Sequence, residues 1–221
     1  MQTTGHMASE HDAQEGAAAV PVTTTPHTDV AGIVSSLPLE TRWPPFTFRY
    51  YAGFWLREMT LKSGLPAVHS IFKPRPTDVL LANFPKSGTT WLKALAFATL
   101  KRSDHPPLAG DHPLRHCSPH DCVRNLELEF GAEEGLESLP SPCLFTTHLP
   151  HTLLPEAITA AGCRVVYICR DPKDVLVSYW HFTKKVAPVF GVDARSFTIQ
   201  DAFELFCQGR CSCGPQWIPL F

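Results

Sequence analysis

The sequence lacks several features that would place the chain in a specialised class. It has no continuous run of about 18 or more apolar residues, so we expect no membrane span and no membrane partner. Its N-terminal part has no charged-then-apolar signal peptide, and the acidic residues there, without arginine, argue against a transit peptide. The net charge is only −2, so no nucleic-acid partner is expected. These absences favour a cytoplasmic, globular protein. The length of 221 residues favours a single folded domain.

A disulfide framework is not expected either. Eight cysteines occur, at positions 117, 122, 143, 163, 169, 207, 211 and 213. Without a secretory signal, a chain of this length is predicted to keep them as reduced thiols. Cys143 and Cys169 lie inside apolar runs and are predicted to be small buried side chains.

The sequence contains no Gly-Lys pair, which excludes the nucleotide-triphosphatase loop G-x-x-x-x-G-K-[ST]. It does contain a different loop of similar character, residues 83–91, Asn-Phe-Pro-Lys-Ser-Gly-Thr-Thr-Trp. The apolar run 79–82 before this loop predicts a buried strand, and residues 91–100 after it are rich in helix formers. A strand, a turn of small residues and a helix present backbone N–H groups and a helix dipole to an anion.

The side chains of this loop suit a phosphate. Lys86 carries a positive charge, and Gly88 lets a ligand approach the backbone. Hydroxyl donors are supplied by Ser87, Thr89 and Thr90. We interpret the loop as a phosphate-binding element; the alternative is a Ser/Thr-rich helix start with a solvated lysine.

The N-terminal third carries few motifs. Residues 1–36 show little periodicity and are predicted to be a disordered tail. Residues 37–55 are rich in aromatic side chains, which we interpret as core anchors rather than the wall of an apolar pocket. A short helix is expected over residues 51–61.

Residues 101–142 hold much of the Pro, Gly and His. The His and Cys side chains in this segment suggest metal ligation at first sight, but their spacing matches no zinc pattern and prolines interrupt it. We therefore predict a variable surface segment and no metal site.

Alternating strands and helices follow. Strands are predicted over residues 143–147 and 164–169, and a helix over 155–161 that ends before Gly162. Asp171 as N-cap and Pro172 at the first turn predict a helix through about residue 185. Thr198 as N-cap predicts a last helix through residue 208, with Asp201 in a capping box. This order indicates an α/β fold with a central parallel sheet flanked by helices.

Three predicted strands end in functional side chains: Lys86 follows the first, His148 the second and Arg170 the third. Ligands bind at the carboxyl ends of parallel strands, so these residues are expected to meet. Arg170 and Ser178 suit a second phosphate, and a neutral His148 suits a base for a hydroxyl proton. The alternatives are an Arg170 that pairs with a nearby Asp and a His148 that only ends a strand.

Three motifs in this order resemble the cytosolic sulfotransferases. They are Phe84-Pro-Lys-Ser-Gly-Thr-Thr-Trp91, Thr147-His-Leu-Pro150 and the segment from Tyr167 to Phe182. The Leu-Lys-Ala-Leu continuation after Trp91 and the segments Phe206–Gly209 and Gly214–Trp217 resemble the plant branch. The resemblance runs from about residue 37 to 217 and implies a three-layer P-loop-like fold for a domain over residues 37–221.

The resemblance implies transfer of a sulfuryl group from 3′-phosphoadenosine 5′-phosphosulfate to a hydroxyl of a small flavonoid, steroid or hydroxy acid. By motif, residues Lys86 to Trp91 would hold the 5′-phosphosulfate, and Arg170 with Ser178 the 3′-phosphate. Lys86 would neutralise charge on the leaving phosphate, and His148 would be the base. No metal is implied, and no expectation about oligomeric state follows.

The sequence also departs from the family pattern. Thr146 stands where many animal members have lysine, and the later Arg-Lys-Gly and G-x-x-G-x-x-K segments, which complete the nucleotide site, are missing. We therefore expect a C-terminally truncated domain. The alternatives are a non-catalytic product that binds adenine nucleotides or pairs with relatives, and a phosphoryl transferase, which would need a carboxylate arrangement for Mg²⁺.

Overall fold

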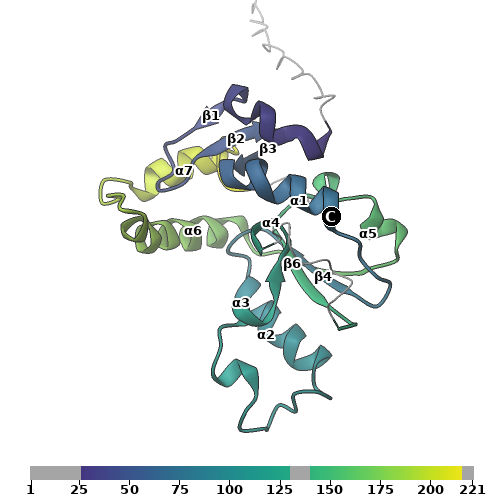
Figure 1. Cartoon of the computed structure of the whole chain (residues 1–221). Coiled ribbons are helices and arrows are strands. Elements are labelled where there is room, and N and C mark those ends of the chain that lie inside the picture. Colours follow the sequence, from purple (N-terminus) through teal and green to yellow (C-terminus); the bar gives the residue numbers. More distant parts are fainter. Residues whose placement is uncertain (1–25, 130–139, 216–221) are drawn as a thin grey trace, which may run out of the picture.

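The centre of the fold is a parallel sheet. The computed structural model describes residues 26–129 and 140–215. Its four-stranded sheet has the order β5-β6-β4-β7, with β5 at Arg124–Asn125, β6 at Leu144–Thr147, β4 at Val79–Asn83 and β7 at Arg164–Ile168 (Figure 1). All three pairings are parallel. The α/β fold and its three main strands are therefore as predicted.

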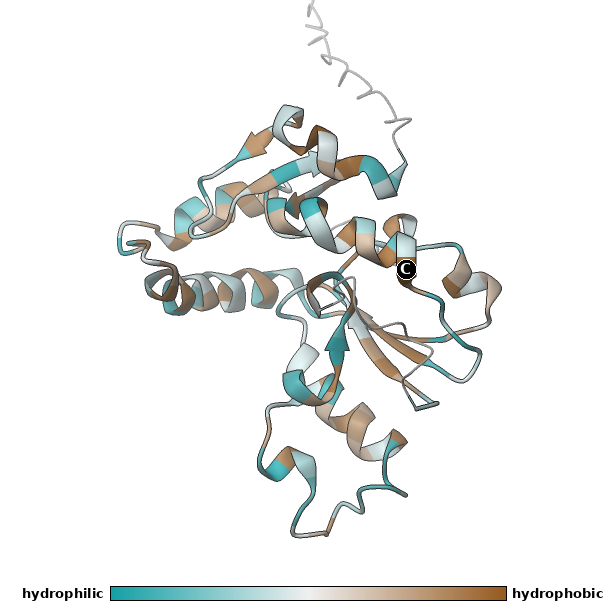
Figure 2. Cartoon of the chain, viewed as in Figure 1, coloured by the Kyte–Doolittle hydropathy of each residue, from teal (hydrophilic) through white to brown (hydrophobic). Residues whose placement is uncertain are grey.

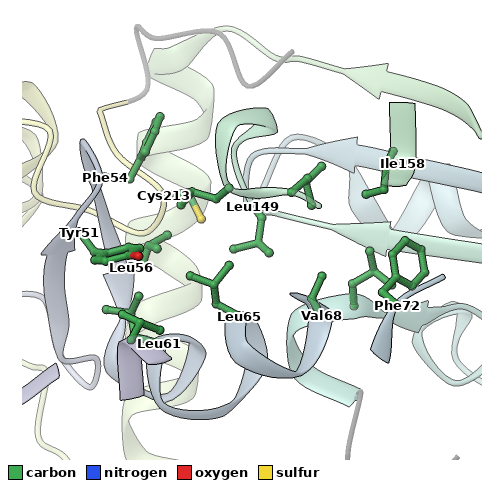
Figure 3. Packing of buried hydrophobic residues seen from close by; sticks show 14 of the residues in the cluster. Tyr51, Phe54, Leu56, Leu61, Leu65, Val68, Phe72, Leu149, Ile158 and Cys213 are labelled. Carbon is green, nitrogen blue, oxygen red and sulfur yellow. The ribbon is translucent and has the colours of Figure 1, made fainter. Parts of the chain in front are cut away.

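Helices cover both faces of the sheet. Alternate residues of a strand point to opposite faces, and apolar side chains on each face pack against helices. On one face, Leu80 and Phe145 belong to a core that includes Leu65 and Val68 of α1 (Leu65–Ile71), seen in Figure 3. On the other face, Leu81 packs in a core with residues of α2 (Thr89–Leu100). The central strand β4 is mostly hydrophobic in Figure 2, as a strand buried on two faces must be, whereas Val165 and Val166 of the edge strand β7 are exposed.

A small antiparallel sheet precedes this layer. It consists of β1 (Leu39–Glu40), β2 (Phe48–Tyr51) and β3 (Phe54–Arg57). Tyr51 pairs with Phe54 across a two-residue turn, and both turn residues have positive φ, 47° at Ala52 and 92° at Gly53. Such a turn closes a β-hairpin. The predicted helix over residues 51–61 is therefore wrong in its first half; the π-helix η2 follows only at Thr60–Gly64.

The aromatic residues of segment 37–55 are core anchors, as predicted. Trp43 is fully buried between the small sheet and α6 (Pro172–Val186), where its ring stacks on Tyr179 at a centroid distance of 4.7 Å. Its indole Nε1–H donates to Thr183 Oγ1 at 2.8 Å. The same core includes residues of α7 (Ile199–Cys207).

The predicted disordered tail is wrong for residues 27–36. They form a 3₁₀-helix, η1 (His27–Ser36), whose Val30 and Val34 are buried in the core beside α1. His27 Nδ1 also lies 2.8 Å from the Tyr51 hydroxyl. Two buried valines four residues apart fix this segment, although it has no strong periodicity. Residues 1–25 of the predicted tail, and residues 216–221 at the other end, lie outside the described residues.

The later helices begin where the sequence predicts. Asp171 caps α6 by accepting from the backbone N–H of Lys173, and Thr198 and Asp201 form a reciprocal capping box at α7. The predicted helix over 155–161 is shorter, α5 at Ala157–Ala160, and Gly162 follows with φ of 69°. The chain also forms short elements at η3 (Pro113–Arg115), α3 (Pro119–Cys122), α4 (Leu126–Glu129), η5 (His151–Leu153) and η6 (Ala187–Phe190).

Two further predictions are corrected. The segment 101–142 is not all surface, because Val123, Leu126 and Glu127 are buried. Cys169 is exposed, whereas Cys143 is buried as predicted. All eight cysteines lie in the described residues, and none forms a disulfide there. Among residues 26–129 and 140–215, no helix has both the length and the apolar character needed to cross a bilayer.

Candidate active site

The loop between β4 and α2 has the geometry of an anion cradle. Gly88 has φ of 108° and precedes α2 without any side-chain cap. The first N–H groups of a helix have no intrahelical partner, so this end offers donors and the positive end of a dipole. Lys86 has φ of 72°, a conformation that non-glycine residues adopt rarely and mostly at functional sites.

Lys86 is poised over an aromatic ring. Its Nζ lies 4.3 Å from the centroid of the ring of Phe182, a residue in the C-terminal half of α6. Burial lowers the pKa of Lys86, and the charges of Lys185 and Arg170 lower it further. An anion at this position would relieve both the desolvation and the repulsion, so the site favours a negatively charged ligand.

His148 is held as a neutral imidazole. Its Nδ1 lies 2.8 Å from the backbone carbonyl oxygen of Asn83, which can only accept a hydrogen bond. Nδ1 therefore carries the proton, and Nε2 has a free lone pair. Burial lowers the pKa of His148, although the nearby Glu127 carboxylate opposes this shift. A neutral imidazole with a free Nε2 is the form that accepts a proton from a hydroxyl.

Glu127 anchors the backbone that carries His148. Its Oε1 accepts from the His148 backbone N–H at 2.7 Å, and its Oε2 accepts from Thr147 Oγ1 at 2.9 Å. Asn125 Nδ2 lies 3.4 Å from the same carboxylate. A buried carboxylate thus orders the end of β6 by charge-assisted hydrogen bonds.

Arg170 faces the loop from the third strand. Its Nη1 lies 3.5 Å from the Lys86 carbonyl oxygen, at the limit of a hydrogen bond, and its Nη2 lies 3.3 Å from Asp174 Oδ2. The pairing with Asp174 that the sequence left open is therefore present. Both side chains are largely exposed, so this ion pair contributes little energy and leaves Arg170 able to turn toward an anion.

These elements surround one pocket of about 460 Å³. The predicted site residues that line it are Lys86, Gly88, Thr89, Thr90, Trp91, His148, Arg170 and Ser178. Ser87 does not line it and is buried beneath the loop, at 4% exposure. The carboxyl ends of the three strands thus bring together residues that are up to 92 positions apart, from Lys86 to Ser178.

Sequence reasoning missed several pocket residues. Glu127, Lys93 and His120 line the pocket but come from segments predicted to be surface or ordinary helix. The alternating Leu-Glu-Leu-Glu sequence of residues 126–129 does not reveal that Glu127 is buried. His120 is one of the His and Cys side chains of segment 101–142, whose spacing suggests only metal ligation. In the part of the chain that the structure describes, no group of three or more His, Cys, Asp or Glu could hold a metal ion.

Known proteins are similar to this chain in sequence and in fold. A family model described as the sulfotransferase domain matches residues 76–219. The chain belongs to the sulfotransferase family. Cytosolic sulfotransferase 12 from Arabidopsis thaliana is 40% identical over 192 residues, which are 86% of this chain and 58% of that protein. Cytosolic sulfotransferase 5 of the same plant is 41% identical over 190 residues, 84% of this chain and 57% of that protein.

Solved sulfotransferase structures agree with this membership. The crystal structure of an Arabidopsis thaliana protein provisionally assigned as a steroid sulphotransferase superposes with a TM-score of 0.70 at 40% identity, covering 84% of this chain and 63% of that one. Mouse sulfotransferase SULT7A1 complexed with PAP gives a TM-score of 0.52 at 26% identity, covering 75% and 52%. The family and fold predicted from the motifs are confirmed. The chain spans somewhat more than half the length of the curated relatives it matches.

Proposed function

We propose that this chain is a sulfotransferase that moves a sulfuryl group from 3′-phosphoadenosine 5′-phosphosulfate to a hydroxyl of a small acceptor. The observation that carries the proposal is the state of His148. The imidazole lines the pocket that the anion cradle also lines, and because its Nδ1–H is held by the Asn83 carbonyl, Nε2 is the nitrogen left to accept a proton. A base beside an anion site is the combination that group transfer to a hydroxyl requires. The names of the relatives support a cytosolic location.

The residues of the cradle fit the phosphosulfate end of this donor. The start of α2 has no side-chain cap, and positive φ at Lys86 and Gly88 turns the loop into the helix, so the first N–H groups of α2 are left for an anion. Around them stand Thr89, Thr90 and Trp91. Ser87 would shape the loop from beneath, because its side chain is buried and its backbone N–H donates to the Phe84 carbonyl oxygen at 3.2 Å. Arg170 and Ser178 would hold the 3′-phosphate, with Arg170 leaving its exposed partner Asp174 to do so.

The donor supplies the sulfuryl group and an adenosine 3′,5′-bisphosphate leaving group when it is bound. Two side chains of this chain then share the chemical work. His148 Nε2 takes the acceptor's hydroxyl proton, and its Nδ1–H stays on the Asn83 carbonyl, which holds the ring in place. Lys86 moves from the Phe182 ring to the oxygen on which negative charge develops.

The acceptor is proposed to be a flavonoid, steroid or hydroxy acid type of compound. The lining of the pocket also includes apolar side chains, among them Leu56, Tyr179 and Phe182. Apolar walls around a small number of polar groups are typical of sites for small organic molecules. Such walls suit a ring system that presents one hydroxyl to His148.

A transfer assay tests the proposal. The purified chain is incubated with ³⁵S-labelled donor and a panel of phenols, flavonols, steroids and hydroxy acids, and labelled product is separated. His148→Asn is the decisive variant because its Nδ2 can still donate to Asn83 while no base remains. We expect transfer to fall by about 10²–10⁴-fold. The matched control is His116→Ala, an exposed histidine whose ring nitrogen lies 3.3 Å from the Gly110 carbonyl oxygen and which does not line the pocket.

Donor binding is measured separately by calorimetry with adenosine 3′,5′-bisphosphate. Binding together with transfer that His148→Asn abolishes supports the proposal. Binding without transfer to any acceptor would favour a non-catalytic nucleotide-binding role. Transfer only of a phosphoryl group from ATP with Mg²⁺ would overturn the proposal.

A further inference from the structure

Three polar side chains, Lys93, His120 and Thr90, form a hydrogen-bonded line that ends at the start of α2, where the anion cradle lies. Lys93 Nζ lies 3.3 Å from His120 Nδ1, and His120 Nε2 lies 3.1 Å from Thr90 Oγ1. Thr90 and Lys93 are one turn apart on α2, whereas His120 comes from α3, which a Ser118–Asp121 capping box fixes. All three side chains line the pocket.

The hydrogen bonds in this line all run in one direction, from Lys93 through His120 to Thr90. Lys93 is buried, and its ammonium also donates to the Val123 carbonyl oxygen at 2.9 Å. An ammonium has no lone pair, so His120 Nδ1 must accept from it. The hydrogen of a neutral His120 is then on Nε2 and is donated to Thr90 Oγ1. Thr90 accepts this bond, which leaves its own hydroxyl hydrogen for another partner.

The surroundings of His120 keep its ring neutral, as this direction requires. Its pKa is lowered by burial first, then by the positive charge of Lys93. Contributions from His148 and Lys86 act in the same sense, and only Asp121 opposes them. The geometry and the electrostatics therefore agree.

The neighbouring threonine differs. Thr89 Oγ1 donates its hydrogen to Asn83 Oδ1 at 2.8 Å, so its hydroxyl hydrogen is already used within the protein. Thr89 can offer a ligand only lone pairs, which an anion does not bind. Of the two threonines at the start of α2, Thr90 is therefore the one whose hydroxyl can donate.

We propose that His120 and Lys93 are positioning residues that orient the Thr90 hydroxyl as a hydrogen-bond donor to the anion held at the start of α2. The inference rests on the proposed function, because that function supplies the anion. It adds His120, which lies outside the motifs that carry the family resemblance, and gives a role to Lys93 of the Leu-Lys-Ala-Leu segment. The bond from Nε2 to Thr90 Oγ1 also polarises the hydroxyl, which strengthens the hydrogen bond that it donates.

A double-mutant cycle on the whole chain tests this relay, with adenosine 3′,5′-bisphosphate as the probe in calorimetry. Thr90→Val keeps the shape and removes the hydroxyl, and Thr90→Ser keeps the hydroxyl. His120→Phe removes both ring nitrogens, and His120→Gln retains an amide N–H donor. We expect Kd to rise about tenfold or more for Thr90→Val, and several-fold for His120→Phe. His120→Gln should recover part of that loss, and Thr90→Ser should bind like the unaltered chain.

The decisive result is non-additivity. If His120 acts through Thr90, His120→Phe should cause no further loss in the Thr90→Val background. Losses that multiply would show that His120 contacts the ligand directly and would overturn the relay. An unchanged Kd in His120→Phe would also overturn it. If the Phe variant does not fold, an unchanged Kd in Thr90→Val would do the same. If the unaltered chain does not bind the bisphosphate, the proposed donor site itself is wrong, and the relay with it.

Discussion

Glu127 is predicted to couple the stability of the domain to the protonation of His148. Its carboxylate accepts from the Thr147 hydroxyl and from the His148 backbone N–H, at 2.9 and 2.7 Å. Glu127→Ala removes both acceptors and leaves two donors at a buried strand end without partners. Each unsatisfied buried group costs about 1–3 kcal/mol, so the free energy of unfolding should fall by about 2–6 kcal/mol.

Glu127→Gln is a milder change. The amide oxygen can still accept from the His148 N–H, so the loss is the difference between a charge-assisted and a neutral hydrogen bond, about 1–2 kcal/mol. The same substitution removes the negative charge that raises the pKa of His148 against its burial. The pKa of His148 should therefore fall further below its ordinary value in Glu127→Gln.

Two measurements check this coupling without any need for catalytic activity. Urea unfolding gives the free energies, and an NMR titration of the His148 imidazole follows its pKa in both proteins. Glu156→Gln serves as the control because this exposed acid makes no side-chain cap hydrogen bond. If Glu127→Ala unfolds at the same urea concentration as the unaltered chain, the anchoring role is refuted. A His148 pKa that rises in Glu127→Gln would refute the electrostatic reasoning.

Three further predictions concern the fold around the site. Trp43→Phe loses the indole donor to buried Thr183, so urea unfolding should show a loss of about 1–3 kcal/mol; an unchanged midpoint would contradict this. Gly64→Ala would place a Cβ against the backbone carbonyl of Glu127, so we expect a melting temperature at least several degrees lower, measured by circular dichroism. Burial lowers the pKa of His148, so below about pH 6.5 the unfolded chain binds more protons than the folded chain. The free energy of unfolding should therefore fall as the pH is lowered from there, and equal urea midpoints at pH 7 and pH 5 would argue against this.

Local patterns predicted the elements whose signals are contained in a few consecutive residues. Apolar runs mark β4, β6 and β7. β4 and β6 are buried, as such runs indicate, whereas Val165 and Val166 of the edge strand β7 are exposed. Side-chain caps mark the starts of α6 and α7, because Asp171 and Thr198 satisfy N–H groups only two or three residues away. The convergence of Lys86, His148 and Arg170 followed from one topological rule, that parallel strands end at the same edge.

The same reasoning failed where a residue's environment comes from distant parts of the chain. Residues 51–61 contain enough helix formers to suggest a helix, but positive φ at Ala52 and Gly53 and pairing of Tyr51 with Phe54 make a hairpin instead. Residues 27–36 show no clear period, yet packing against α1 orders them. Tertiary contacts override weak local propensity in both cases.

The sequence by itself determined the family, the parallel sheet and eight of the residues that line the pocket, because motifs and periodicity are contained in neighbouring residues. Only the tertiary structure decided which atoms of those residues are available for chemistry. The proton on His148 is assigned by a carbonyl 65 positions away, and the direction of the Thr90 hydroxyl by His120, 30 positions away. A hydrogen bond sets a tautomer or a rotor only through its partner, and the fold chooses that partner.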